Sequence, residues 1–461
     1  MTMKQTQTRI TIIFSAVAVV LVLLAIVTEP KQVTPDAFSD LGEEFFPEFT
    51  DPNAARTLEV IEFDEETGSA RPFKVTYQGG RWTIPSHYDY PADGKDRLAK
   101  TAASVIGIAK GDFRTDNVSD HAACGVIDPL DESVVELKGR GKRVTIKGEN
   151  DVVLADLIIG KSYEDRENFH LVRLPDQKRV YGALIDVDIS TKFSDWIESD
   201  LLKVEKEELR SITLKDYSIN EATKKLEMRD ELVVEKQADD AWAANGMTDE
   251  QEVDKYKMNN FLKALDELSI VGVRPKPQGL TASLRQSSGQ VKINTSDLMS
   301  LQSKGFYFTG DGLLRSNEGE MVAVTSRGVS YTLRFGEVAY GSEFEVSAGS
   351  QDEGEDVKGP GENRYLMITS NFDEAVFEEP PLPANTDFQE KPDSMWTAED
   401  HRMKSMQMAH DEWETNLAEG RRLSDELNSR FAEWYYVISA DSYHKLRLTR
   451  DDLLKDKPKQ N

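Results

Sequence analysis

The sequence predicts an α+β protein with an N-terminal transmembrane helix, two related β-rich modules that each carry a packed helix, and a C-terminal helical insertion. Three observations support this fold class. One N-terminal segment has no charge, the same order of strand and helix patterns occurs twice, and a late segment shows apolar residues at seven-residue spacing. The predicted division is 1–9 cytoplasmic tail, 10–27 transmembrane anchor, 28–54 linker, 55–205 first module, 206–379 second module, 380–432 helical insertion, and 433–461 closing strand and tail.

Residues 10–27 are long enough to cross a bilayer as a helix. At about 1.5 Å per residue they span roughly 27 Å, close to the thickness of the hydrocarbon core. Lys4 and Arg9 precede the segment and carboxylates follow it, which favours a cytoplasmic N-terminus and an exported body. We therefore expect a single-pass protein of the bacterial inner (cytoplasmic) membrane, with its body periplasmic or extracytoplasmic.

Two other interpretations of residues 10–27 stay open. A cleaved signal peptide would have a shorter apolar region and a small-x-small cleavage site, which residues 27–30 match poorly. The third interpretation is a buried core helix. Behind the segment, prolines and carboxylates in residues 28–54 indicate an extended linker.

The composition excludes several partners. A net charge of −27 repels nucleic acid and anionic lipid headgroups, so we expect no nucleic-acid binding. Cys124 is the only cysteine, so no intramolecular disulfide can form. For an exported chain, this favours a bacterial envelope protein over a eukaryotic secreted protein.

The first module begins with alternating apolar and polar residues at 58–63 and 73–77, which predict half-buried strands. A Gly-Gly turn leads to Trp82, and a helix starts near Asp93, a plausible N-cap. The helix ends in Ser-Val-Ile-Gly-Ile at residues 104–108.

The second module repeats this order. Strand patterns at 209–214 and 231–235 precede Trp242 and an amphipathic helix that ends in Ser-Ile-Val-Gly-Val at residues 269–273. Later matches pair 331–337 with 157–161, 364–368 with 170–173, and 434–438 with 180–181. Several matches in one order predict an internal duplication.

The insertion at residues 380–432 opens with prolines, and Ser394 or Thr397 can cap the helix that follows. This helix either packs on its own domain or presents a coiled-coil surface to a partner. Its apolar seams comprise Trp396, Met403, His410, Leu417 and Phe431 at one position and Met406, Trp413, Leu427 and Trp434 at the other.

His121 and Cys124 form the only histidine–cysteine pair that is close in sequence. A nucleophilic dyad would need an orienting third group, and zinc would need more ligands than the local spacing supplies. We interpret the pair as a boundary segment in which Cys124 is a small buried hydrophobic residue.

Other candidate motifs also have structural interpretations. Residues 139–142, Gly-Arg-Gly-Lys, resemble a fragment of a phosphate loop but fit a hairpin turn between two strands. Trp82 and Trp242 could stack sugars, but equivalent positions in two modules favour a shared core role. The acidic loop at 351–356 is expected to be solvated, with only a weak suggestion of calcium. We predict no catalytic, cofactor-binding or metal-binding residues, and no cofactor.

Six motifs in combination resemble the bacterial domain-of-unknown-function 4340 (DUF4340) family, over about residues 55–300. The resemblance implies a single-span envelope protein that acts as an accessory subunit beside ABC transporter components, and it supplies no catalytic residues. The motifs are Gly-Gly-Arg-Trp82, Pro91-Ala-Asp93, Gly125-Val-Ile-Asp-Pro129, Ile158-Ile-Gly-Lys161, Leu171-Val-Arg173 and Val180-Tyr181.

The expected function is therefore non-enzymatic: a membrane-anchored accessory or scaffold subunit of an ABC transporter or related envelope complex. Its expected partners are the membrane, through one span, and another envelope protein. A glycan- or ligand-binding module is the first alternative, and it would need an aromatic-lined pocket between the modules. A hydrolase is the second, and it would need converging carboxylates or the His121–Cys124 pair in one cleft.

Overall fold

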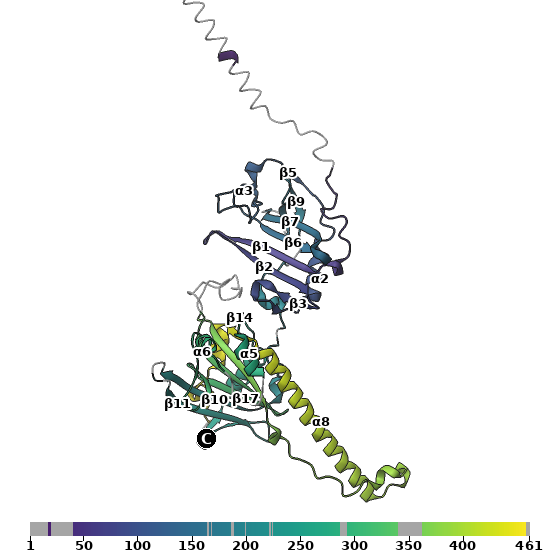
Figure 1. Ribbon diagram of the computed structural model, residues 1–461, viewed down its shortest axis with the longest axis vertical. Helices are drawn as coiled ribbons and strands as arrows, with labels where there is room; N and C mark the ends of the chain where they lie inside the picture. Colours follow the sequence, from purple (N-terminus) through teal and green to yellow (C-terminus); the bar gives the residue numbers. More distant parts are fainter. Residues whose placement is uncertain are drawn as a thin grey trace, which may run out of the picture.

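The computed structural model describes residues 17–19, 40–163, 166, 168–185, 189–198, 200–220, 223, 225–285, 293–339 and 362–457. Within these residues the protein is built on two large antiparallel sheets, which lie one after the other along the long axis of the molecule (Figure 1). The acidic loop at 351–356 lies outside the described residues.

The first sheet has nine strands in the order β4-β3-β2-β1-β6-β7-β8-β9-β5. Alternation along β1 buries Leu58 and Val60 completely, as the sequence pattern predicts. Helix α2 (Lys95–Val105) buries the predicted face against this sheet, and it begins after Gly94, one residue later than the predicted cap. The strands are β1 (Thr57–Asp64), β2 (Ser69–Gln78), β3 (Arg81–Ile84), β4 (Tyr90–Pro91), β5 (Phe113–Thr115), β6 (Lys142–Lys147), β7 (Val153–Ser162), β8 (Phe169–Arg173) and β9 (Val180–Leu184).

The second sheet has eight strands in the order β12-β11-β10-β17-β18-β19-β20-β14. Helix α4 (Lys255–Asp266) buries Met258, Phe261 and Leu265 against the core, on the face predicted from the sequence. The strands are β10 (Leu209–Asn220), β11 (Lys225–Lys236), β12 (Trp242–Ala244), β14 (Gly272–Pro275), β17 (Glu320–Thr325), β18 (Val329–Val338), β19 (Arg364–Phe372) and β20 (Trp434–Ile438).

We call the part of the protein that contains the first sheet the first half and the part that contains the second sheet the second half. Smaller elements complete the second half. Two short ribbons pair β13 with β21 and β15 with β16. The remaining elements are β13 (Gln251–Val253), β15 (Phe306–Phe308), β16 (Leu314–Ser316), β21 (Leu454–Asp456), α5 (Gln278–Arg285), α6 (Thr295–Gln302), α9 (Ala440–Leu446) and α10 (Arg450–Leu453), with α3 (His121–Cys124) in the first half.

The two sheets repeat one strand order. Each starts from a long hairpin, β1–β2 or β10–β11, continues outward to a short strand, and then passes through a helix to the opposite edge strand, β5 or β14. Four strands then fill the space between the hairpin and that edge, in sequence order, in both sheets. This is the arrangement that the predicted duplication requires. The module boundaries at 205 and 206 remain a prediction.

The two halves are in direct contact. The rings of Tyr90 in β4 and Trp434 in β20 lie 5.0 Å apart, edge to face. Arg430 donates a hydrogen bond to the carbonyl oxygen of Asp200 at 3.1 Å, and one cluster of buried hydrophobic residues runs through both sheets. The halves therefore share a core.

The end of the predicted linker belongs to the first half. Phe45 and Phe49 are 7% and 2% exposed and pack in the core. Asp40 accepts a hydrogen bond from the Tyr181 hydroxyl at 2.5 Å. Residues 40–54 are thus packed, whereas residues 28–39 of the predicted linker lie outside the described residues.

The helical insertion lies between β19 and β20, at the place where the first sheet has only a short connection between β8 and β9. Its long helix α8 (Ala398–Ala432) has Thr397, one of the two predicted caps, as N-cap, and Thr397 and Asp400 form a capping box. Figure 1 shows the N-terminal part of α8 projecting well away from the sheets.

The predicted transmembrane helix is overturned. Most of residues 10–27 lie outside the described residues, and only 17–19 are described, in helical conformation. In the part of the chain that the structure describes, no helix combines the length and apolarity needed to cross a bilayer. The fold class is therefore corrected to α+β without this helix, and the inner-membrane localisation, which rested on it, is corrected as well.

Candidate functional site

His121 and Cys124 do not form a reactive pair. The Nε2 atom of His121 lies 2.9 Å from the carbonyl oxygen of Lys178. Cys124 is 4% exposed and packs in a small cluster with Val126 and Ile158. Burial raises the pKa of its thiol, so the thiolate needed for nucleophilic attack is disfavoured. The interpretation of Cys124 as a buried hydrophobic residue is confirmed.

The Gly-Arg-Gly-Lys segment lies at the end of a loop and not in a hairpin between two strands. Arg140 pairs with Ile127 in an isolated parallel bridge, and β6 begins only at Lys142. A side chain at Gly141 would meet the carbonyl oxygen of Gly125 at 2.8 Å. The glycines therefore allow close backbone approach. The predicted hairpin is wrong because no strand directly precedes this segment in the described chain. Arg140 pairs instead with Ile127, at the other end of a loop.

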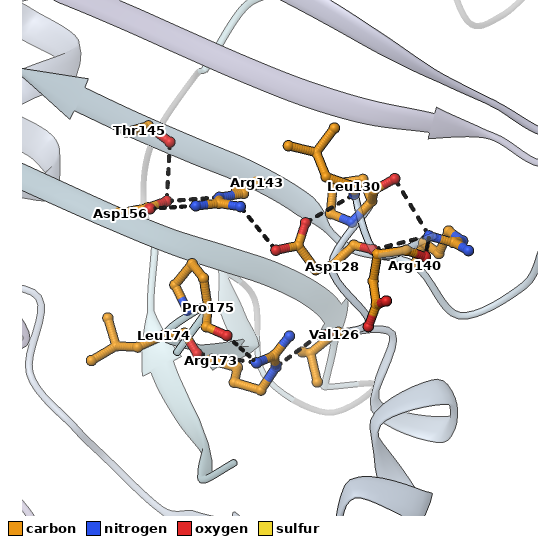
Figure 2. Close-up of polar contacts among 12 residues, drawn as sticks. Val126, Asp128, Leu130, Arg140, Arg143, Thr145, Asp156, Arg173, Leu174 and Pro175 are labelled. Carbon is orange, nitrogen blue, oxygen red and sulfur yellow. Dashed lines mark hydrogen bonds and ion pairs between the residues drawn. The ribbon is translucent and has the colours of Figure 1, made fainter. Parts of the chain in front are cut away.

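An ion-pair network connects this loop to the sheet (Figure 2). Arg143 in β6 donates to both carboxylate oxygens of Asp156 in β7, at 3.0 and 2.7 Å, and to Asp128 in the loop at 2.9 Å. Thr145 donates to Asp156 at 3.0 Å. The hydrogen bonds to Asp156 raise the pKa of the Arg143 guanidinium, which therefore stays charged.

Arg173 in β8 is a second buried arginine, 7% exposed, and its burial lowers its pKa. Its Nε donates to the carbonyl oxygen of Val126 at 3.0 Å. Its Nη1 donates to the carbonyl oxygens of Leu174, Pro175 and Gln177. These contacts satisfy buried backbone acceptors, so Arg173 has a structural role.

Four of the six resemblance motifs converge in space, those at residues 125–129, 158–161, 171–173 and 180–181. The loop at 125–129 packs on Gly160, where an added side chain would meet the carbonyl oxygen of Cys124 at 2.5 Å. Arg173 from the next strand binds the same loop, and Val180 joins the same hydrophobic cluster. These four motifs build a packing unit, whereas the motifs at Trp82 and at residues 91–93 lie in or just after β3 and β4, at the opposite edge of the sheet. Sequence spacing gave no signal for the role of Arg173, because its partners are carbonyl groups.

The two tryptophans occupy equivalent strands, Trp82 in β3 and Trp242 in β12. Both are partly buried and pack against the main core, in agreement with the predicted core role. Among the described residues, no cluster of three or more histidine, cysteine, aspartate or glutamate side chains could hold a metal ion.

The most unusual surface is the projecting part of the insertion, which we call the arm and define as residues 377–418. Its predicted seam is occupied by its own chain. Met403, His410 and Leu417 are 4%, 8% and 7% exposed. The Nδ1 atom of His410 lies 3.4 Å from the carbonyl oxygen of Pro380, and the Trp396 indole donates to the carbonyl oxygen of Phe388 at 3.0 Å. The segment of the chain before α8 therefore covers the seam.

Other apolar side chains of the arm remain exposed. Leu382, Met395 and Met408 are 60%, 68% and 57% exposed. The arm also contains ten acidic and only three basic residues. Flexible, polarisable methionines are common at protein-binding surfaces, so the arm combines an adaptable apolar surface with negative charge.

The base of α8 is fixed by a buried lysine that sequence analysis missed. The Lys276 amine donates to the carbonyl oxygens of Phe431 and Trp434, at 2.8 and 2.6 Å. Burial lowers its pKa to about 7, and a neutral amine has two N–H groups for these two acceptors. An adjoining groove of about 350 Å³ is bordered by Lys276, Arg285 and Glu433. The sequence gives only a weak signal for this role of Lys276, which is that the residue stands two positions before the helix α5.

Comparisons with known proteins bear on the same part of the chain. Residues 82–283 match the family model described as Domain of unknown function (DUF4340). No curated protein and no solved structure matches the chain significantly. The match begins at Trp82 in β3. It includes Arg143, Arg173 and the residues with which these two arginines form hydrogen bonds. The resemblance inferred from the motifs is confirmed, and the chain carries a DUF4340 domain over residues 82–283.

Proposed function

We propose that this protein is a non-enzymatic accessory or scaffold subunit that binds another protein through the arm. The partner class that the DUF4340 resemblance implies is a component of an ABC transporter complex. The observation that carries the proposal is the projecting arm, which exposes Met395 just before α8 and Met408 on α8, a helix that is fixed at its C-terminal end.

The geometry of α8 supports a binding role. Near its C-terminal end, the side-chain amide of Asn428 donates to the carbonyl oxygen of Ser370 at 2.7 Å and accepts from the Ser370 amide at 2.8 Å. Leu427 and Phe431 are 1% exposed and belong to the main core. The arm is therefore a rigid extension of the second sheet, and rigidity reduces the entropy that binding must overcome.

Two observations weigh against the alternatives. The aromatic residues between the two halves, Tyr90 and Trp434, pack edge to face against each other, and the groove that Trp434 borders is lined by residues of the second half alone. The strongest carboxylate candidates near the family motifs, Asp128 and Asp156, are both paired with Arg143. These contacts favour a protein-binding role over a glycan-binding module or a hydrolase.

The test uses purified ABC transporter components immobilised for biolayer interferometry, with the full chain in solution. We expect Met408→Asp to weaken binding about tenfold or more, because a charge replaces an apolar contact. Met299→Asp is the matched control, since Met299 is 66% exposed and lies on α6, away from the arm. The proposal fails if no component binds the full chain, or if Met408→Asp and deletion of residues 385–430 both leave binding unchanged.

A further inference from the structure

A second surface lies at the other end of the molecule, on the loop between α3 and β6. Its base is closed where the Ile127 amide donates to the carbonyl oxygen of Gly139 at 3.2 Å and the Gly141 amide donates to that of Ile127 at 2.8 Å. A compact loop whose ends meet in this way is an Ω-loop, a type of segment that often carries function. We call residues 128–139 the arginine-filled loop.

Arg140 fills this loop. Its guanidinium lies over the ring of Phe63, 4.4 Å from the centroid, so the loop is also fastened to β1. Arg143 fixes the first residue of the loop through Asp128 (Figure 2). Arg140 donates hydrogen bonds to the carbonyl oxygens of Asp128 at 3.0 Å, Asp131 at 3.0 Å, Val134 at 2.6 Å and Glu136 at 3.2 Å.

The ordered loop exposes apolar side chains. Leu130, Val135 and Leu137 are 49%, 87% and 47% exposed. Single exposed apolar residues are ordinary, but here three lie within eight residues of a loop whose backbone is held in place. The DUF4340 packing unit therefore holds an apolar surface in a fixed conformation, which lowers the entropic cost of binding a partner.

The border of this surface is acidic. Glu132 and Glu136 are exposed within the loop. Leu137 also approaches the β1–β2 turn, since a side chain at Gly68 would lie 3.5 Å from its Cδ2 atom, and that turn exposes Glu65 and Glu66. Lys138 is the one exposed basic residue of residues 128–139.

We propose that the arginine-filled loop is a second protein-binding surface, distinct from the arm, and that its partner presents an apolar patch bordered by lysine or arginine. Charge complementarity selects this partner. A second copy of the chain bound at the same loop would bring two acidic borders together. An anionic membrane would meet the same repulsion.

The test uses the full chain and a fluorescent amphipathic peptide of leucine and lysine, which has the proposed chemistry. We expect saturable binding in fluorescence anisotropy, weakened about tenfold by the double substitution Val135→Ser and Leu137→Ser, a loss that corresponds to about 1.4 kcal/mol. Leu184→Ser is the matched control, since Leu184 is 62% exposed on β9, and it should keep wild-type affinity. A photo-crosslinker on the peptide should label residues 128–139.

A second variant separates surface chemistry from loop order. Arg140→Lys keeps the positive charge and all three apolar side chains but cannot bind four carbonyl groups at once. We expect it to weaken peptide binding while the melting transition of the fold is retained. The proposal is overturned if the double variant binds as tightly as Leu184→Ser, if a peptide with glutamate in place of lysine binds equally well, or if zwitterionic vesicles and not the peptide contact the loop.

Discussion

His87 is a buried histidine with aromatic neighbours. It is 2% exposed, and its ring stacks on Phe193 with centroids 4.7 Å apart. Its Nδ1 atom lies 3.0 Å from the Ser86 hydroxyl, whereas Nε2 has no hydrogen-bond partner. Burial, and to a smaller extent the positive charge of Arg274, lower the pKa of His87 to about 4. The folded protein therefore keeps this imidazole neutral.

This pKa predicts a pH-dependent stability. Between about pH 6.5 and 4, the unfolded chain binds a proton at His87 that the folded chain does not. The free energy of unfolding should therefore fall as the pH drops through this window, by on the order of 3 kcal/mol. His87→Phe should flatten this part of the profile in urea titrations at several pH values. His444→Gln, at an exposed position, should keep the wild-type profile, and an equal flattening by both variants would contradict the prediction.

At the scale of single residues, the sequence correctly predicted those residues whose role is to pack as apolar side chains. Cys124 and the two tryptophans were placed correctly, because apolar residues in strand and helix patterns pack inward. Arg140, Arg173 and Lys276 were missed as structural residues. Each acts by donating to carbonyl groups that are brought near by tertiary contacts, and no spacing in the sequence records such acceptors.

At the scale of elements, α8 rests on the second sheet through a glycine. Gly420 is buried, and an added side chain would collide with the ring of Phe372 in β19 and meet the carbonyl oxygen of Arg327 at 2.8 Å. Glycine normally weakens a helix by about 1 kcal/mol relative to alanine. Its presence here is explained by the close approach of helix and sheet.

Gly420→Ala should therefore destabilise the protein. The gain in helix propensity is about 1 kcal/mol, whereas overpacking costs roughly 1–3 kcal/mol, so we expect a net loss of about 1 kcal/mol and a lower melting temperature. Glu419→Ala, at the exposed neighbouring position, should leave the melting temperature nearly unchanged. A Gly420→Ala variant more stable than wild type would show that α8 does not sit closely on β19.

Elements with strong local signals were predicted well. Alternation located the hairpin strands, and side-chain type limited the cap of α8 to Ser394 or Thr397, of which the structure has Thr397. The turn at residues 139–142 was not, because Arg140 pairs with Ile127 across a twelve-residue loop. The seam of α8 was identified, but its partner proved to be the preceding segment of the same chain, which has no heptad pattern of its own.

At the scale of the whole molecule, the two halves are coupled by a small aromatic contact and a shared core. Trp434 is 7% exposed, contacts Tyr90 of the first half, and lies at the end of α8 in the second. Tyr436 in the same strand is fully buried, and its pKa is raised well above the ordinary value by burial. Because the two halves share this aromatic contact and one core, we expect the two sheets to unfold together.

We expect wild-type protein to show one calorimetric transition. Trp434→Ala should cost about 3–5 kcal/mol and separate the melting of the two halves into two transitions. Trp396→Ala, a partly buried tryptophan in the arm, should lower the stability less and keep a single transition. Two transitions in the wild-type protein would contradict the coupling.

At this scale, the repeated order of elements along the chain was predicted, and the two sheets share one strand order. The membrane anchor was predicted from hydropathy, and the described residues contain no helix that could serve as one. The contact between the halves had no sequence signal, since Tyr90 and Trp434 are far apart in the chain.

The central claim is that the exposed methionines of the arm contact a protein partner. Its most direct test is oxidative footprinting of the full chain, alone and with purified ABC transporter components, because exposed methionines are oxidised readily. Met395 and Met408 are 68% and 57% exposed, as is the control Met299 at 66%. We predict that the complex protects Met395 and Met408 from oxidation and leaves Met299 reactive, whereas equal oxidation of all three in the complex would contradict the account.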